Sequence, residues 1–178
     1  ADRPGSGLHL HLSITDANGQ AVMADKSDSH GLSKIGRECI AGILAHSPAL
    51  AAFHAPSVNS YKRLVIGRSL SGTTWAPAHI AWGNNNRTTV LRTVSGRMEF
   101  RLTDGSTNIY AALASTIAAM LDGLEQKMTP PVPIDEDIYE WDETQFKRHR
   151  IKTLPQNMGE ALAALSSDNS LAKALGED

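Results

Sequence analysis

The sequence has a single cysteine, no long apolar run and no dense cluster of basic residues. Its only cysteine, Cys39, excludes an internal disulfide and a thiolate metal cluster. No apolar stretch reaches the roughly 18 residues of a membrane-spanning helix, and the opening residues show no signal-peptide pattern. The 17 Lys and Arg residues are matched by 19 Asp and Glu, without four consecutive basic residues. These absences predict a soluble, cytoplasmic protein that binds neither nucleic acid nor membrane.

The remaining composition is typical of a folded domain. Apolar residues make up 41% and charged residues 20%, with 14 Gly and 8 Pro, which excludes disordered and collagen-like chains. A length of 178 residues predicts one domain or a piece of a larger one. The chain starts without Met and alternates in a strand pattern by His9, so we expect it to begin inside a domain.

The first polar motif lies on a predicted strand. Residues 8–14 alternate strictly between apolar and polar, which predicts a half-buried strand whose polar face carries His9, His11 and Ser13. Two imidazoles at this spacing can reach one metal ion or one polyanion. Exposed His-x-His also occurs on solvated sheets, and the pattern alone favours that alternative.

Periodicity and turn signals predict the other elements. Apolar side chains recur at helical spacing over 32–44 and 108–126, and Ser47-Pro48 is expected to open a shorter helix over 49–53. We further expect a turn at 18–19 with a return strand at 21–23, a long irregular segment over 54–77, and strands over 87–94 and 97–102. A surface excursion over 130–142 and short helices within 143–175 complete the prediction, and Leu162 and Leu165 are expected to share an apolar stripe on those helices.

The second predicted hairpin gathers charge on one face. If Ser95-Gly96 is a two-residue turn, Arg92 lies opposite Glu99, and Arg97 and Arg101 share their face. A solvated Arg92–Glu99 ion pair, worth at most about 1 kcal/mol, is the simpler interpretation, but it leaves two arginines unexplained. Arginines suit bidentate contact with carboxylate and phosphate. A polyanionic ligand with a metal at the lone carboxylate is therefore about equally supported.

These motifs, taken in order, resemble the C-terminal catalytic domain of glutamine synthetases. The resemblance covers nearly the whole chain, and two further stretches, 71–77 and 154–157, are more similar to the bacterial branch that includes type III-like enzymes and γ-glutamylmethylamide synthetases. The motifs that carry it are residues 5–13, 59–65, 86–92, 97–101, 108–110 and 121–123.

The resemblance implies a fold and an activity. The fold is α+β, with a curved antiparallel sheet backed by helices, and residues 1–178 would form an incomplete catalytic domain. The activity is an ATP-dependent ligation in glutamine biosynthesis, in which ammonia or a small amine displaces phosphate from γ-glutamyl phosphate. The family uses Mg²⁺ or Mn²⁺ and forms ring-shaped homo-oligomers. The alternatives are a γ-glutamyl-polyamine or methylamide ligase, and a non-catalytic protein with a binding or regulatory role.

The resemblance also implies roles for individual residues and an absent region. The family's N-terminal small domain and the first part of its catalytic domain, with most of the metal-binding glutamates, would lie upstream, so the chain alone is expected to be inactive. The implied roles are metal binding for His9 and Glu99, glutamate binding for Gly5, Arg63 and Arg101, nucleotide binding for His11, Ser13, Arg87, Arg92 and Arg97, and catalysis by Arg87 and Arg92.

Three departures from the family pattern concern the substrates. Pro4 stands where an Asn commonly touches glutamate, so a side-chain contact is lost there. Ser69 occupies the place of a flap Glu that helps to deprotonate ammonium, so the identity of the amine substrate stays open. The turn at 94–96 is shorter than in many members, so a nucleotide-side Lys has no counterpart.

Overall fold

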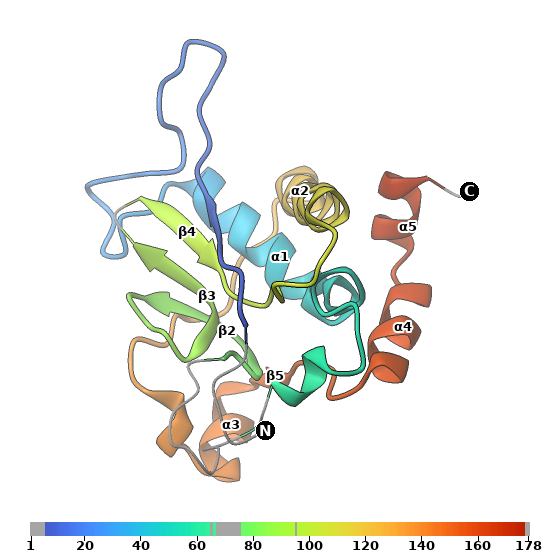
Figure 1. Ribbon diagram of the computed structural model, residues 1–178. Coiled ribbons are helices and arrows are strands. Elements are labelled where there is room, and N and C mark those ends of the chain that lie inside the picture. Colours follow the sequence, from blue (N-terminus) through green and yellow to red (C-terminus); the bar gives the residue numbers. More distant parts are fainter. Residues whose placement is uncertain (1–5, 65, 67–75, 95, 177–178) are drawn as a thin grey trace.

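A computed structural model describes residues 6–64, 66, 76–94 and 96–176, and the elements are arranged in layers (Figure 1). A five-stranded sheet is covered on one face by the two long helices, and the C-terminal helices pack beyond them. The predicted α+β class is confirmed. The elements are β1 Leu10–Leu12, α1 Lys34–His54, β2 His79–Asn84, β3 Thr89–Val94, β4 Arg97–Phe100, α2 Ile109–Glu125, α3 Glu143–His149, β5 Lys152–Thr153, α4 Met158–Ser166 and α5 Asn169–Leu175, with 3-10 turns at Ser60–Lys62 and Ile138–Glu140.

The sheet has the strand order β1-β4-β3-β2-β5. Arg92 pairs with Glu99 and Val94 with Arg97, which confirms the predicted register of the second hairpin. The β1–β4, β3–β4 and β2–β5 pairs are antiparallel, but β2 and β3 run parallel, so the expectation of an antiparallel sheet is wrong for that one pair. Strands β2 and β5 are not among the elements predicted from sequence.

The side chain of Asn86 holds the short return between the parallel strands. Its Nδ2 donates to the carbonyls of Ile134 and Glu136, each at 2.7 Å. Its Oδ1 accepts from the backbone N–H and the hydroxyl of Thr88, at 2.8 and 2.6 Å. Ile134 and Ile138 are thereby buried beside β2, so the stretch 130–142 is only in part the surface excursion that was expected.

Helix α1 continues through the proline that was expected to divide it. Ser33 caps its start, accepting from the N–H of Gly36 at 3.2 Å, and Pro48 lies inside the helix. Pro48 removes one helical N–H donor, which ordinarily costs about 3 kcal/mol. Leu44 and Leu50, on either side of it, are both buried in the main core. Burial of apolar side chains before and after Pro48 therefore outweighs the loss of that hydrogen bond.

Helices α1 and α2 cross at two glycines. A Cβ atom on Gly42 would lie 2.1 Å from the carbonyl oxygen of Ala119, and one on Gly123 would lie 2.3 Å from that of Glu38. Both positions therefore require glycine for the close approach. Asn108 caps α2, accepting from the N–H of Tyr110 at 3.0 Å, which confirms the start of the predicted helix over 108–126.

Other expectations are met in part. The turn at 18–19 forms, with Gly19 at φ +77°, but the return strand is only a single bridge between Thr15 and Ala21. The short C-terminal helices form, yet Leu162 is 50% exposed, so the expected apolar stripe does not include it. Within the described ranges no helix is both long and apolar enough to cross a membrane.

Candidate functional site

Three neighbouring strands bring polar side chains to one face of the sheet. Glu99 on β4 pairs with His11 on β1 and with Arg92 on β3. Paired residues of adjacent strands share a face, and the next pairs, Leu10 and Leu91 with Phe100, are buried in the main core. The polar face therefore lies opposite the helix-covered one.

Glu99 is the centre of this face and is only 3% exposed. Its Oε1 accepts from Nη1 of Arg101 at 2.8 Å and lies 2.7 Å from Nδ1 of His9. Its Oε2 accepts from Nη1 of Arg92 at 2.9 Å. Both carboxylate oxygens thus contact guanidinium groups, in short charge-assisted hydrogen bonds. We call His9, Arg92, Glu99 and Arg101 the Glu99 cluster.

The cluster fixes the charge states of its members. Burial alone would raise the pKa of Glu99, but the hydrogen bond from Arg92 and the charge of Arg101 outweigh it, so the pKa is lowered. Burial and the charge of Arg101 lower the pKa of His9, against the attraction of Glu99. A neutral His9 that donates from Nδ1 to Glu99 keeps a lone pair on Nε2, which can bind a metal ion or accept a hydrogen bond.

Asn85 positions Arg92 and was not assigned a role from sequence. Its Oδ1 accepts from both Nε of Arg92, at 3.2 Å, and Nη2 of Arg92. Asn85 has φ +54°, in the left-handed region that Asn tolerates better than most residues. The run of three Asn residues at 84–86 was the available signal.

Four further residues are assigned to the nucleotide: His11 lies on β1 and Arg97 on β4, whereas Ser13 follows β1 and Arg87 lies between β2 and β3. Arg97 and His11 are exposed, and Nε of Arg97 donates to Nδ1 of His11 at 3.4 Å. Ser13 and Arg87 are also exposed. Within the described ranges neither of these two is joined to the Glu99 cluster by a hydrogen bond or an ion pair.

Arg63 approaches the cluster from the segment after α1. It is 8% exposed, and its Nη2 donates to the carbonyls of Leu102 and Thr103, the latter at 3.1 Å. Burial lowers the pKa of its guanidinium. Its buried Nε has no hydrogen-bond partner among the described residues, so this group still has a donor to offer.

Gly7 leaves space between Arg63 and His9. A Cβ atom there would lie 3.3 Å from Nη1 of Arg63 and 3.5 Å from Nε2 of His9. A ligand can therefore approach both side chains beside this backbone. Gly5, like Pro4, Ser69 and Ser95 of the family departures, lies outside the described residues.

The donor set fits part of a divalent metal site. With Nδ1 of His9 bonded to Oε1 of Glu99 at 2.7 Å, Nε2 of His9 keeps a lone pair that can bind an ion beside the carboxylate. No group of three or more His, Cys, Asp or Glu side chains in the described part of the chain is arranged to hold a metal. His9 and Glu99 can therefore supply an imidazole nitrogen and a carboxylate oxygen, and other ligands must complete the shell.

Known proteins are similar to this chain over nearly its whole length. The family model for the catalytic domain of glutamine synthetase matches residues 1–178. A glutamate–methylamine ligase from Methyloversatilis universalis is 50% identical over 178 residues, which are 99% of this chain and 40% of that protein. A glutamine synthetase from Halobacterium salinarum is 44% identical, over 97% of this chain and 38% of that protein.

Solved structures show the same similarity. A GmaS–ADP complex superposes with a TM-score of 0.86 at 38% identity, over 97% of this chain and 39% of that one. GmaS without ligand gives a TM-score of 0.83 at 36% identity, over 97% of this chain and 38% of that one. The chain spans about two fifths of the length of the curated relatives it matches.

Proposed function

Because the chain belongs to the glutamine synthetase catalytic-domain family, we propose that it forms part of an ATP-dependent ligase that joins ammonia or a small amine to glutamate. The observation that carries the proposal is the Glu99 cluster, a buried carboxylate whose two oxygens are held by Arg92 and Arg101 beside a neutral imidazole. Phosphoryl transfer depends on positioning and charge neutralisation more than on covalent chemistry, and a cationic face of this kind provides both.

The proposed reaction has two steps. An oxygen of the γ-carboxylate of glutamate attacks the γ-phosphorus of ATP, the bond to the bridging oxygen breaks, and ADP leaves. The amine nitrogen then attacks the γ-carbonyl carbon, the bond to the phosphate oxygen breaks, and the nitrogen loses a proton. Negative charge develops on phosphate oxygens in the first step and on the carbonyl oxygen in the second, so fixed cations favour both steps.

Individual residues divide these tasks. Arg63 and Arg101, with the backbone of Gly5, would bind the carboxylates of glutamate. Arg87, Arg92 and Arg97 would neutralise the phosphates, with Arg87 and Arg92 nearest the transferred group, and His11 and Ser13 would contact the nucleotide. Among the described residues the buried Nε of Arg63 has no partner, which supports its assignment to glutamate. The hydrogen bonds from Arg92 to Asn85 support the assignment of Arg92 to the phosphates.

We also propose that His9 and Glu99 contribute to a Mg²⁺ or Mn²⁺ site. A divalent ion there would offset the charge of the nucleotide phosphates. The lowered pKa of His9 supports this assignment, because a neutral imidazole has the lone pair that a metal needs.

The amine that the similarity favours is methylamine. The glutamate–methylamine ligase is 50% identical to this chain, against 44% for the Halobacterium glutamine synthetase, and both GmaS structures superpose well. Ammonia is the second candidate, and a γ-glutamyl-polyamine ligase the third.

For the whole protein we propose a ring-shaped homo-oligomer, as the family resemblance implies. An apolar row on α2 is open for contact with other protein, with Tyr110, Ile117 and Leu121 exposed by 83%, 50% and 51%. Light scattering of the full-length protein tests this proposal, and a monomer at micromolar concentration would contradict it.

A chimera tests the activity. The residues of the Methyloversatilis ligase that precede its match are joined to this chain, and ADP formation is measured with glutamate and either methylamine or ammonia. We expect ADP formation that requires both glutamate and an amine, with a higher kcat/KM for methylamine. Glu99→Gln should abolish it, whereas Ala45→Gln, at an exposed position on α1, should leave it unchanged. A chimera with native-like circular dichroism and no glutamate-dependent ADP formation would contradict the proposal.

A further inference from the structure

A cavity at the β5 edge of the sheet shares no lining residue with the Glu99 cluster. Its volume of about 620 Å³ is within the range of small-molecule sites. His79 on β2 and Ile66 line it together with one continuous stretch that runs from Trp141 through α3 to Thr153 on β5.

Aromatic rings form one wall of this cavity. The rings of His79 and Phe146 are stacked, with centroids 4.1 Å apart and planes 23° from parallel. The ring of Trp141 lies 5.6 Å from that of Phe146, at 58°. A planar ligand can stack against such a wall, because offset and tilted ring pairs are favourable.

Two buried nitrogens on this wall have no hydrogen-bond partner among residues 6–64, 66, 76–94 and 96–176. His79 is 4% exposed, and its Nδ1 has no hydrogen-bond partner among the described residues. The same holds for the buried Nε1 of Trp141. Buried polar groups of this kind are nearly always satisfied by protein, water or ligand. The indole N–H can only donate, so within the described ranges it is an unused donor.

The rim of the cavity is cationic. Lys147, Arg150 and Lys152 line it, and the one acidic lining residue, Glu143, is paired with Lys147 at 3.3 Å. Arg150 and Lys152 form no ion pair with any residue of the described ranges. The uncompensated charge favours an anion over an amine.

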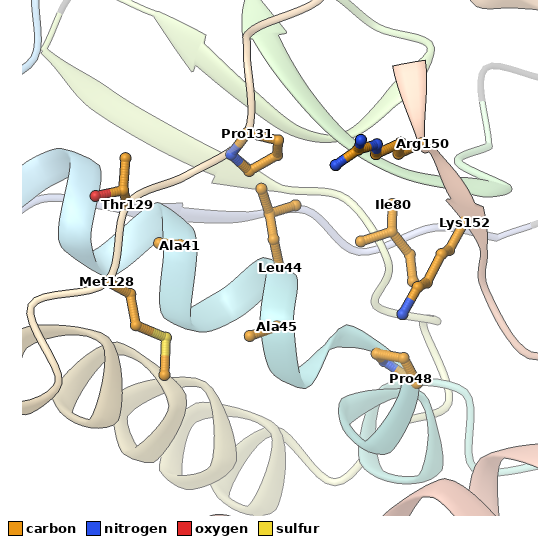
Figure 2. Close-up of a pocket in the computed structure, with 10 residues that line it drawn as sticks. All are labelled: Ala41, Leu44, Ala45, Pro48, Ile80, Met128, Thr129, Pro131, Arg150 and Lys152. Atoms are coloured by element: carbon orange, nitrogen blue, oxygen red, sulfur yellow. The ribbon is translucent and has the colours of Figure 1, made fainter. Parts of the chain in front are cut away.

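A second cavity on the other face of the same strands provides a comparison (Figure 2). It measures about 410 Å³ and lies between α1 and β2, with Leu44, Ala45 and Ile80 among its lining residues. Arg150 and Lys152 line it too, but it contains no aromatic ring and no buried nitrogen without a partner. Of these two cavities, the one beside His79 therefore combines an aromatic wall with a cationic rim.

We propose that the cavity beside His79 binds a small planar aromatic ring that bears a carboxylate or a phosphate. The ring stacks on the aromatic wall formed by Phe146 and Trp141, and the anionic group faces Arg150 and Lys152. This site is separate from the proposed ligase chemistry, so either can fail without the other.

Calorimetric titration of the 178-residue chain tests the proposal. The probes are indole-3-acetate, phenyl phosphate and neutral indole. We expect an aromatic anion to bind at least about tenfold more tightly than indole, since one charge-assisted contact contributes about that factor. The carboxylate and phosphate probes distinguish the two possible anionic groups. Equal affinity for indole and both anions, or no binding of either anion, would overturn the proposal.

Variants locate the binding to this cavity. Arg150→Asn combined with Lys152→Gln removes two exposed charges and keeps a residue that tolerates the left-handed backbone at 150, where φ is +55°. We expect it to reduce the affinity for the anion about tenfold, and Phe146→Leu to reduce it similarly. Ala45→Gln, which fills the other cavity, should have no effect. Weaker binding in Ala45→Gln with unchanged binding in Phe146→Leu would refute the assignment.

Discussion

The carboxylate of Glu99 has more cationic neighbours than it can neutralise. Arg92 and Arg101 both donate to it, and Arg63 and Arg97 add positive charge nearby. Burying such charges is costly unless they are paired. An anionic ligand would supply the missing negative charge, so the cluster is better suited to holding phosphate and carboxylate groups than to stabilising the fold.

Arg101 allows the substrate role to be separated from a structural one. Replacing it with Lys in the chimera keeps the charge but loses the two-pronged contact, and a charge-assisted hydrogen bond is worth roughly 1.5–3 kcal/mol. We therefore expect the KM for glutamate to rise by one to two decades, at about 1.4 kcal/mol per decade, with the KM for ATP little changed.

The matched variant is Arg97→Lys on the same strand, which should raise the KM for ATP and leave that for glutamate nearly unchanged. Steady-state kinetics and a melting curve for both variants decide the matter. If Arg101→Lys lowers the melting temperature without changing the KM for glutamate, its role is structural.

His46 illustrates a different use of charge, because it joins three helical elements. Its Nδ1 lies 2.6 Å from a carboxylate oxygen of Asp168, at the start of α5, and its Nε2 lies 3.0 Å from one of Asp122 on α2. Only the imidazolium can donate from both nitrogens. Burial opposes this charge, but the two carboxylates outweigh burial and raise the pKa of His46.

The raised pKa sets the direction of a pH effect. Stabilisation by His46 is complete below the unfolded-state pKa of about 6.5 and is lost as the pH rises through the higher folded-state pKa. We expect the difference in unfolding free energy between the wild-type chain and His46→Gln to shrink from about pH 5.5 to pH 9. Urea denaturation at several pH values measures it, and a difference that grows with pH would show that His46 is buried as the neutral form.

At the scale of elements, the crossing of α1 and α2 depends on Gly42 and Gly123. A methyl group on Gly42 would overlap the backbone of α2, at 2.1 Å from the carbonyl oxygen of Ala119. We expect Gly42→Ala to destabilise the chain by about 1–3 kcal/mol, the usual range for overpacking. Ala114→Val, on the exposed face of α2, adds more volume but should lower the free energy of unfolding by at most about 0.7 kcal/mol. Equal melting temperatures for the two variants would show that the helices can separate without cost.

Which elements could be predicted from sequence depends on whether their signals are local. The hairpin of β3 and β4 has alternation, β-branched residues and a turn glycine, so its register could be predicted down to the Arg92–Glu99 pair. Strand β2 has no such alternation, because it is buried on both faces between α1 and the stretch around Ile134. Pro48 is a local stop signal that packing on both sides overrides.

At the scale of the whole molecule, the described residues supply an incomplete site. His9 and Glu99 are the only assigned metal ligands, and the chain spans about two fifths of the length of its relatives. We therefore expect the isolated 178-residue chain to form no ADP from ATP, glutamate and methylamine. Measurable glutamate-dependent ADP formation by the chain alone would show that a complete site is present.

The candidate site was predictable where charge and alternation coincide. Arg92 and Glu99 lie on β3 and β4, His9 directly precedes β1 and Arg101 directly follows β4, and the structure brings the four side chains together. The contribution of Asn85 was not predictable, because it depends on the backbone conformation of the return between two parallel strands. The role of Gly5 stays a prediction, because it lies outside the described residues.

The fate of the γ-carboxylate oxygens of glutamate tests most directly whether the reaction passes through γ-glutamyl phosphate. The chimera is supplied with ATP, methylamine and glutamate whose γ-carboxylate oxygens are both ¹⁸O, and the released phosphate is analysed by mass spectrometry. If the γ-carboxylate attacks ATP and the amine then displaces phosphate, each phosphate carries one ¹⁸O atom. Formation of the γ-glutamyl amide with unlabelled phosphate would contradict the γ-glutamyl phosphate route proposed for this site.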